Sequence, residues 1–137
     1  MRAIVLTATA LLVAAAPAGA KVHPAVAPAT GKPSSTFKVG FKADRTLPSN
    51  AWYEVDVTST SRRPGCEYWE NAVISHARKG RPVGVRLSPV DKHRWCAGDY
   101  KGTVSLARRT PCGDSLDDYV CYDERVLGRF RLHVTAG

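Results

Sequence analysis

Apolar and polar residues alternate with a period of two along most of this chain, the pattern of strands that bury one face of a sheet. The alternation is clearest where Phe37, Val39 and Phe41 are separated by Lys or Gly residues. It recurs in four later segments, at residues 53–58, 83–88, 100–106 and 129–134. We predict one further strand within residues 66–77 (CEYWENAVISHA), although Val73 interrupts the alternation there.

Turn-forming residues separate the alternating segments. They occur at Leu47-Pro48-Ser49-Asn50, Arg63-Pro64-Gly65, Lys79-Gly80-Arg81-Pro82 and Thr110-Pro111-Cys112-Gly113. No window shows a helical period long enough for a stable helix. Six or seven short strands with turns between them predict an all-β fold, an antiparallel β-sandwich of about 100 residues.

The start of the chain has the three regions of a secretory signal peptide. Met1-Arg2 carries charge, residues 3–16 are apolar, and small residues at 17–20 form an Ala-x-Ala site. Cleavage after Ala20 would leave 137 − 20 = 117 residues of a secreted protein. The apolar run is shorter than the ~20 residues of a membrane-spanning helix, and no second run follows, so we predict no membrane span.

Residues 21–35 (KVHPAVAPATGKPSS) combine Pro, Ala, Ser and Gly without any periodicity. This composition is typical of a flexible leader. We therefore predict three regions: a signal peptide over 1–20, a flexible leader over 21–35 and a folded domain over 36–135.

All four cysteines follow the predicted cleavage site, which indicates a disulfide-stabilised domain that folds in an oxidising compartment. Of the three possible pairings, we predict Cys112–Cys121, because these residues bracket a short polar step between two strands, and this leaves Cys66 for Cys96. No Cys-x-x-Cys or His-x-x-x-His spacing occurs, so we predict no metal site and no cofactor.

Residues 87–106 contain Ala97-Gly98-Asp99-Tyr100 followed by Val104, which resembles the corner before strand F of immunoglobulin-like domains. Over residues 36–135, the succession TFKVGFKA, RPVGVRLSP, WCAGDYKGTV and LGRFRLHV resembles immunoglobulin-like domains of secreted, mostly uncharacterised proteins from GC-rich Gram-positive bacteria. The resemblance implies a Greek-key sandwich of about seven strands. Tyr100 would be a corner residue whose hydroxyl bonds to nearby backbone.

The chain departs from antibody domains at one position. Those domains carry their second cysteine two residues after the corner tyrosine, where this chain has Gly102. The resemblance therefore predicts that no disulfide joins the two sheets. It implies no particular activity, because this fold carries many unrelated functions.

The chain is basic, with 20 Lys and Arg against 12 Asp and Glu and a formal net charge of +8. Such a charge attracts anionic polymers, and it also keeps a secreted domain soluble. Our candidate binding residues for a polysaccharide or an anionic cell-wall polymer are Trp69, Trp95, Arg62, Arg63 and Arg94. The alternative, which we favour, is that the two tryptophans pack inside the sandwich and the arginines are solvated.

Residues 112–125 (CGDSLDDYVCYDER) concentrate acidic side chains on this basic chain. Asp114, Asp117 and Asp118 are candidates to contact a basic protein partner. They match no calcium-loop pattern. We therefore expect a solvated loop held by the Cys112–Cys121 disulfide.

No catalytic motif is recognisable: the chain lacks Gly-x-Ser-x-Gly, His-Glu-x-x-His and a glycine-rich phosphate loop. No nucleic-acid-binding module is present either. The sequence favours a secreted, monomeric, non-catalytic interaction or structural module of the bacterial cell envelope, with an envelope protein or an anionic cell-wall polymer as its partner. A polysaccharide-binding domain and a small secreted enzyme or protease inhibitor are the alternatives.

Overall fold

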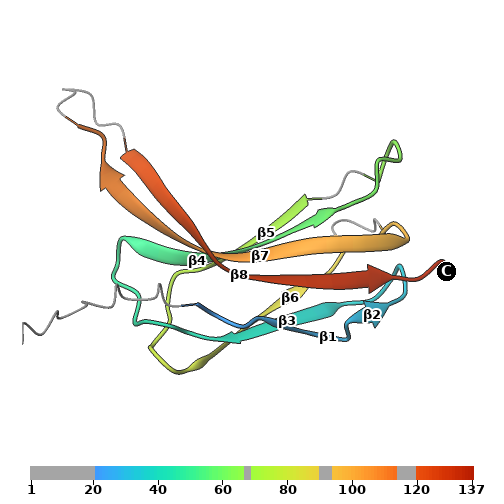
Figure 1. Cartoon of the computed structure of the whole chain (residues 1–137), viewed down its shortest axis with the longest axis horizontal. Coiled ribbons are helices and arrows are strands. Elements are labelled where there is room, and N and C mark those ends of the chain that lie inside the picture. Colours follow the sequence, from blue (N-terminus) through green and yellow to red (C-terminus); the bar gives the residue numbers. More distant parts are fainter. Residues whose placement is uncertain (1–20, 67–68, 90–93, 114–119) are drawn as a thin grey trace, which may run out of the picture.

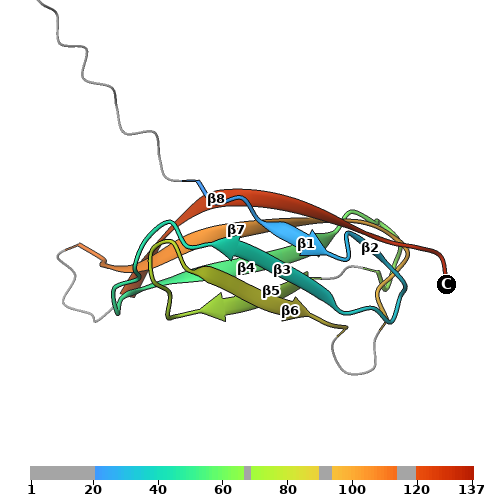
Figure 2. The ribbon, with the colours of Figure 1, turned by 90° about the horizontal axis from the view of Figure 1, so that it is seen from below.

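Two β-sheets pack face to face in the computed structural model, which describes residues 21–66, 69–89, 94–113 and 120–137 (Figures 1 and 2). The first sheet has the order β1 (Ala25–Ala27), β3 (Phe37–Lys42), β6 (Pro82–Leu87). The second has the order β2 (Thr30–Gly31), β8 (Val120–Val134), β7 (Gly98–Pro111), β4 (Ala51–Ser59), β5 (Trp69–Ile74). The predicted all-β sandwich is confirmed, and the less regular segment 66–77 contains β5.

The described residues form no helix, and so none that has the length and hydrophobicity to cross a membrane.

The apolar side of each alternating segment faces the space between the sheets. Phe37, Val39 and Phe41 of β3 are buried against residues of the second sheet, such as Val55 and Val104. Fully burying side chains of this kind stabilises the fold by roughly 1.5–3 kcal/mol each. Burial of the alternating apolar positions is therefore what holds the two layers together.

A polar network lies at the edge of this core. The Tyr53 side chain is buried and its hydroxyl donates to Asp44 Oδ1 at 2.5 Å, while Arg45 pairs with Asp44 Oδ2 at 2.5 Å. Burial, together with the hydrogen bond to Asp44, raises the pKa of Tyr53 to about 12. Burial of Asp44 opposes its ionisation, but the hydrogen bonds from Arg45 and Tyr53 hold its pKa below the usual value.

The prediction of a flexible leader over residues 21–35 is wrong. β1 pairs antiparallel with β3, and β2 pairs parallel with β8, so this segment contributes a strand to each sheet. The Ala27-Pro28 peptide bond between the two strands is cis. Strands of two or three residues are too short to show an alternation, and their backbone hydrogen bonds require partners more than ten residues away.

The chain before β1 is held at an irregularity in β8. Leu127 is skipped in the β7–β8 register, between the pairs Val104–Gly128 and Ser105–Val126, and its carbonyl accepts a hydrogen bond from the Val22 amide at 3.3 Å. A Cβ on Gly128 would lie 2.7 Å from the Val22 carbonyl oxygen. The bulge and the glycine together provide the surface on which the N-terminal segment packs.

β7 and β8 form a long hairpin that continues beyond the sandwich at one end (Figure 1). β8 already begins at Val120, so the predicted acidic loop 112–125 is shorter than expected and Asp123 and Glu124 lie on a strand. The polarity of this segment suggested a loop. It pairs as a strand because the Cys112–Cys121 disulfide and the β7 ladder supply the partner.

Candidate functional site

Both predicted disulfides are present and confirmed, Cys66–Cys96 with a Cα–Cα distance of 5.7 Å and Cys112–Cys121 with 5.2 Å. Neither joins the two sheets. Gly102 lies under the ring of Phe130, and a Cβ at this position would lie 2.0 Å from a ring carbon. The position that holds a cysteine in antibody domains has no room for one here.

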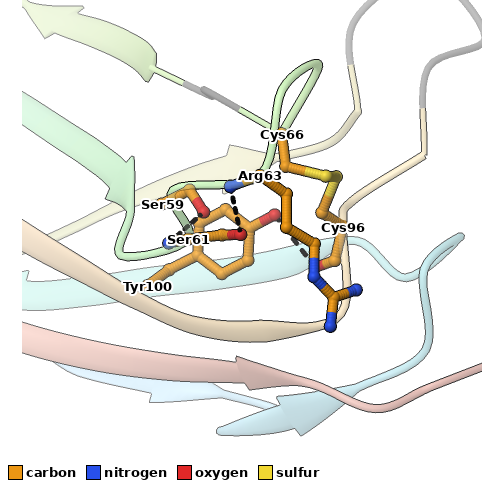
Figure 3. The surroundings of a disulfide bond; sticks show 6 residues. All are labelled: Ser59, Ser61, Arg63, Cys66, Cys96 and Tyr100. Atoms are coloured by element: carbon orange, nitrogen blue, oxygen red, sulfur yellow. Dashed lines mark hydrogen bonds between the residues drawn. A yellow bond between two sulfur atoms is a disulfide. The ribbon is translucent and has the colours of Figure 1, made fainter.

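The loop after β4 and the start of β7 meet at the first disulfide, as Figure 3 shows. Tyr100 is 1% exposed, and its hydroxyl donates to the Cys96 carbonyl at 3.0 Å, the contact expected of a corner tyrosine. Burial raises the pKa of Tyr100. Gly98, at the start of β7, has a φ of 131°, a conformation that glycine adopts readily.

Trp95 is not part of a binding surface, and the favoured alternative, that it packs inside the sandwich, is confirmed. Its side chain is 1% exposed and packs edge-on against Phe37 and Tyr100, with ring centroids 5.4 and 5.2 Å away. Its indole nitrogen donates to the Ser35 carbonyl at 2.8 Å. Trp95 therefore joins the two sheets and the N-terminal segment, and is unavailable for stacking on a sugar.

The remaining aromatic candidate, Trp69, lies on an edge strand, at the start of β5 in the five-stranded sheet. Asp114, Asp117 and Asp118 lie outside the described residues, and their proposed contact with a basic partner stays a prediction.

The arginine candidates lie at one end of the five-stranded sheet, which we call the basic end. Arg62 and Arg63 follow β4, Arg94 precedes β7, and the first disulfide joins the two loops. On the outer face nearby, Lys101 of β7 lies directly opposite Arg131 of β8 in the strand register, and both are exposed. Like charges placed opposite each other cost stability, so this end is a candidate surface for an anionic ligand.

Towards the opposite end of the same sheet, the outer face forms a groove of about 540 Å³ that we call the aromatic groove. Ala51, Tyr53 and Val55 of β4 point into the core, so Trp52 and Glu54 between them point outwards. The side chains that give the groove its chemistry are Trp52, Glu54, Val73, Arg109, Tyr122 and Glu124.

Trp52 is the centre of the contacts in the aromatic groove. Its ring packs edge-on against Tyr122 at 5.6 Å, and the Arg109 guanidinium lies over it, 5.8 Å from the ring centroid. Its indole nitrogen donates to Glu54 Oε1 at 2.6 Å. These contacts fix the orientation of Trp52 and leave Tyr122 as the most exposed ring, at 62%.

A group of three carboxylates borders the groove. One oxygen from each of Glu54, Asp56 and Glu124 can be chosen so that all lie within 4.8 Å of one another. Asn71 donates to Asp56 Oδ1 at 2.8 Å. Among the described residues, no lysine, arginine or histidine is in ion-pair contact with any of the three.

Sequence reasoning missed Trp52, Tyr122 and this carboxylate group as site residues. An alternating strand points its outer side chains to solvent, and the outer side of β4 carries Trp52, Glu54 and Asp56. This placement was the one sign in the sequence that these residues could form a surface site. Their convergence with Glu124 depends on which strands become neighbours.

No protein-family model matches this chain, and the searches of curated proteins and of solved structures also return no significant match.

Proposed function

We propose that this protein is a secreted, non-catalytic, immunoglobulin-like interaction module of the bacterial envelope, which binds an envelope protein through the outer face of its five-stranded sheet. The strand arrangement supports the immunoglobulin-like assignment, since β3 pairs with β6 in one sheet while β8, β7 and β4 are consecutive in the other. The Tyr100 corner agrees with it. The signal-peptide pattern and the two disulfides support secretion.

The distribution of exposed apolar side chains carries the proposal. Val73, Val120, Tyr122 and Val126 are 59%, 52%, 62% and 42% exposed, and they are the exposed large hydrophobic residues of the described chain. All four belong to strands of the five-stranded sheet, and Val73 and Tyr122 line the aromatic groove. Exposed apolar side chains concentrated on one face are typical of protein interfaces, and Tyr, Trp and Arg are the residues that anchor them.

The geometry of the groove favours a protein over a stacked sugar. A sugar ring stacks best on a large free aromatic face, but Trp52 is already in contact with Arg109 and Tyr122, and the most exposed ring of the groove is the smaller Tyr122. An ordered cluster of Trp, Tyr and Arg is the composition of a protein-binding hot spot.

Site-specific photo-crosslinking tests the proposal. A photoreactive residue is introduced in place of Val73 in the groove, and a control in place of Lys38, which is exposed on the other sheet. On bacterial envelopes we expect one defined protein adduct from position 73, and we expect excess unlabelled protein to abolish it. Equal labelling from both positions, or no protein adduct from position 73, would contradict the proposal.

The basic end supports a second candidate function, binding of an anionic cell-wall polymer. Lys101 and Arg131 face solvent together, next to the loops that carry Arg62, Arg63 and Arg94. Binding to purified cell wall should then fall sharply as salt rises to ~0.5 M. Arg131→Glu should abolish it while Arg86→Glu, on the other sheet, should not. Retention at high salt would argue against this function.

N-terminal sequencing of the exported protein tests the predicted cleavage. The first residue should be Lys21. An N-terminus upstream of Ala20 would contradict the assigned site.

A further inference from the structure

The outer face of the five-stranded sheet brings three carboxylates together over one strand. β7 lies between β4 and β8. Glu54 on β4 is opposite Ser105 of β7, and Asp56 on β4 is opposite Thr103. Glu124 on β8 is opposite Ala107. One oxygen from each carboxylate lies within 4.8 Å of the others, and the three β7 positions that they flank are centred on Ser105, which itself lies between Glu54 of β4 and Val126 of β8.

Ser105 provides a second, independent observation at this part of the sheet. Val104 and Leu106 on either side point into the core, so the Ser105 side chain points to the outer face, the face that carries the three carboxylates. It is 0% exposed, and its hydroxyl is the one buried side-chain oxygen or nitrogen of the described residues that has no hydrogen-bond partner. An unpaired buried hydroxyl is destabilising, and a ligand to its oxygen would remove that cost.

From these two observations we propose that Glu54, Asp56, Glu124 and the Ser105 hydroxyl bind a divalent cation, and that the ion is Ca²⁺. The site goes beyond the proposed interaction function and does not depend on it. Three carboxylates without a cationic partner repel one another, and one divalent ion would offset most of this repulsion.

The donor set and its spacing favour Ca²⁺ among biological cations. All of the proposed ligands are oxygens, whereas zinc sites in proteins are built mainly from histidine nitrogen and cysteine sulfur. The donor set therefore disfavours zinc. Ca²⁺ accepts six to eight oxygens at about 2.3–2.6 Å, so oxygens on opposite sides of one ion can be about 4.8 Å apart. Mg²⁺ requires about 2.1 Å and a stricter octahedron, which suits this spread of oxygens less well.

Two neighbouring groups hold the carboxylates in place. Trp52 donates to Glu54 at 2.6 Å and Asn71 donates to Asp56 at 2.8 Å. Such outer contacts orient the ligands of metal sites. Because Trp52 is bonded to a proposed ligand, its fluorescence should respond when the ion binds.

Calorimetric titration of the purified, disulfide-bonded protein with CaCl₂ tests the site. We expect one saturable site with a Kd of about 0.1–1 mM, the range of extracellular calcium modules. Mg²⁺ should bind at least tenfold more weakly. Ca²⁺ should change the tryptophan emission, and Trp52→Phe should remove this change.

Matched variants separate the site from general charge effects. Glu124→Gln should weaken Ca²⁺ binding at least tenfold, whereas Asp123→Asn, its neighbour on the opposite side of β8, should leave the Kd within twofold. Ser105→Ala should weaken binding at least threefold, and circular dichroism shows that each variant is folded. The proposal is overturned by an absence of saturable binding up to ~10 mM, by equal losses in the two β8 variants, by equal affinity for Mg²⁺, or by unchanged affinity in Ser105→Ala. No partner is present in this titration, so its failure would leave the proposed interaction function standing.

Discussion

Replacing Tyr100 with phenylalanine removes one hydroxyl group and leaves the buried ring in place. The lost hydroxyl donates to the Cys96 carbonyl at 3.0 Å, between the first disulfide and the start of β7 (Figure 3). The ring keeps its edge contact with Trp95 at 5.2 Å. The substitution therefore reports on the hydrogen bonding of the Tyr100 hydroxyl, which also involves the Ser59 side chain, and leaves the apolar packing almost unchanged.

The cost follows from what each partner loses. A hydrogen bond of this kind contributes about 0.5–1.5 kcal/mol net, and a buried acceptor left unpaired costs about 1–3 kcal/mol. Cys96 is half-buried, so water can reach its carbonyl in part, and we expect a loss of about 1–2 kcal/mol in the free energy of unfolding. With an unfolding entropy of about 2.1 cal/mol/K per residue, this lowers Tm by roughly 4–8 °C for a domain of this size.

Urea denaturation of the oxidised protein, followed by circular dichroism, measures the change. The m-value should stay constant, so that the shift in midpoint reports stability alone. Tyr122→Phe is the matched control: its ring is 62% exposed in the groove, and we expect a change below about 0.5 kcal/mol. If Tyr100→Phe unfolds at the wild-type midpoint, the corner hydrogen bond does not stabilise this protein and the reasoning is refuted.

Three further predictions concern stability. Gly102→Ala should cost about 3 kcal/mol or prevent folding, because the new Cβ would lie 2.0 Å from the overlying aromatic ring, while Gly40→Ala, with its nearest neighbour at 3.7 Å, should be tolerated in thermal melts. Replacing Cys66 and Cys96 together by alanine should cost about 3.6 kcal/mol from the chain entropy of a 30-residue separation, and an unchanged denaturation midpoint would count against it. The folded-state pKa of Tyr53, raised to about 12, lies above the usual 10, so stability is fully present below pH 10 and is lost as the pH rises towards 12. Thermal melts from pH 9 to 12 should show this loss, and Tyr53→Phe should reduce it.

The alternation of apolar residues was sufficient to predict the main strands and the layers. Phe37, Val39 and Phe41 face the core because successive side chains of a strand point to opposite sides, a local property of the backbone. The pairing of Cys112 with Cys121 was also predictable, since the two are only nine positions apart in the sequence. Both features depend on residues that are close together in the sequence, and such local features can be predicted without knowing the fold.

Only the tertiary structure decided where binding chemistry gathers. Residues 21–35 show no pattern of their own and become strands because β3 and β8 offer them hydrogen-bond partners. The sequence left Trp95 open between a sugar-binding ring and a core residue, with the core favoured, and it is buried because two sheets and the N-terminal segment close around it. Glu54 and Glu124 are seventy residues apart and come together on the outer face only because β4 and β8 both lie beside β7. A contact between distant residues depends on which strands become neighbours, and an alternating pattern identifies the strands and their faces without specifying their order.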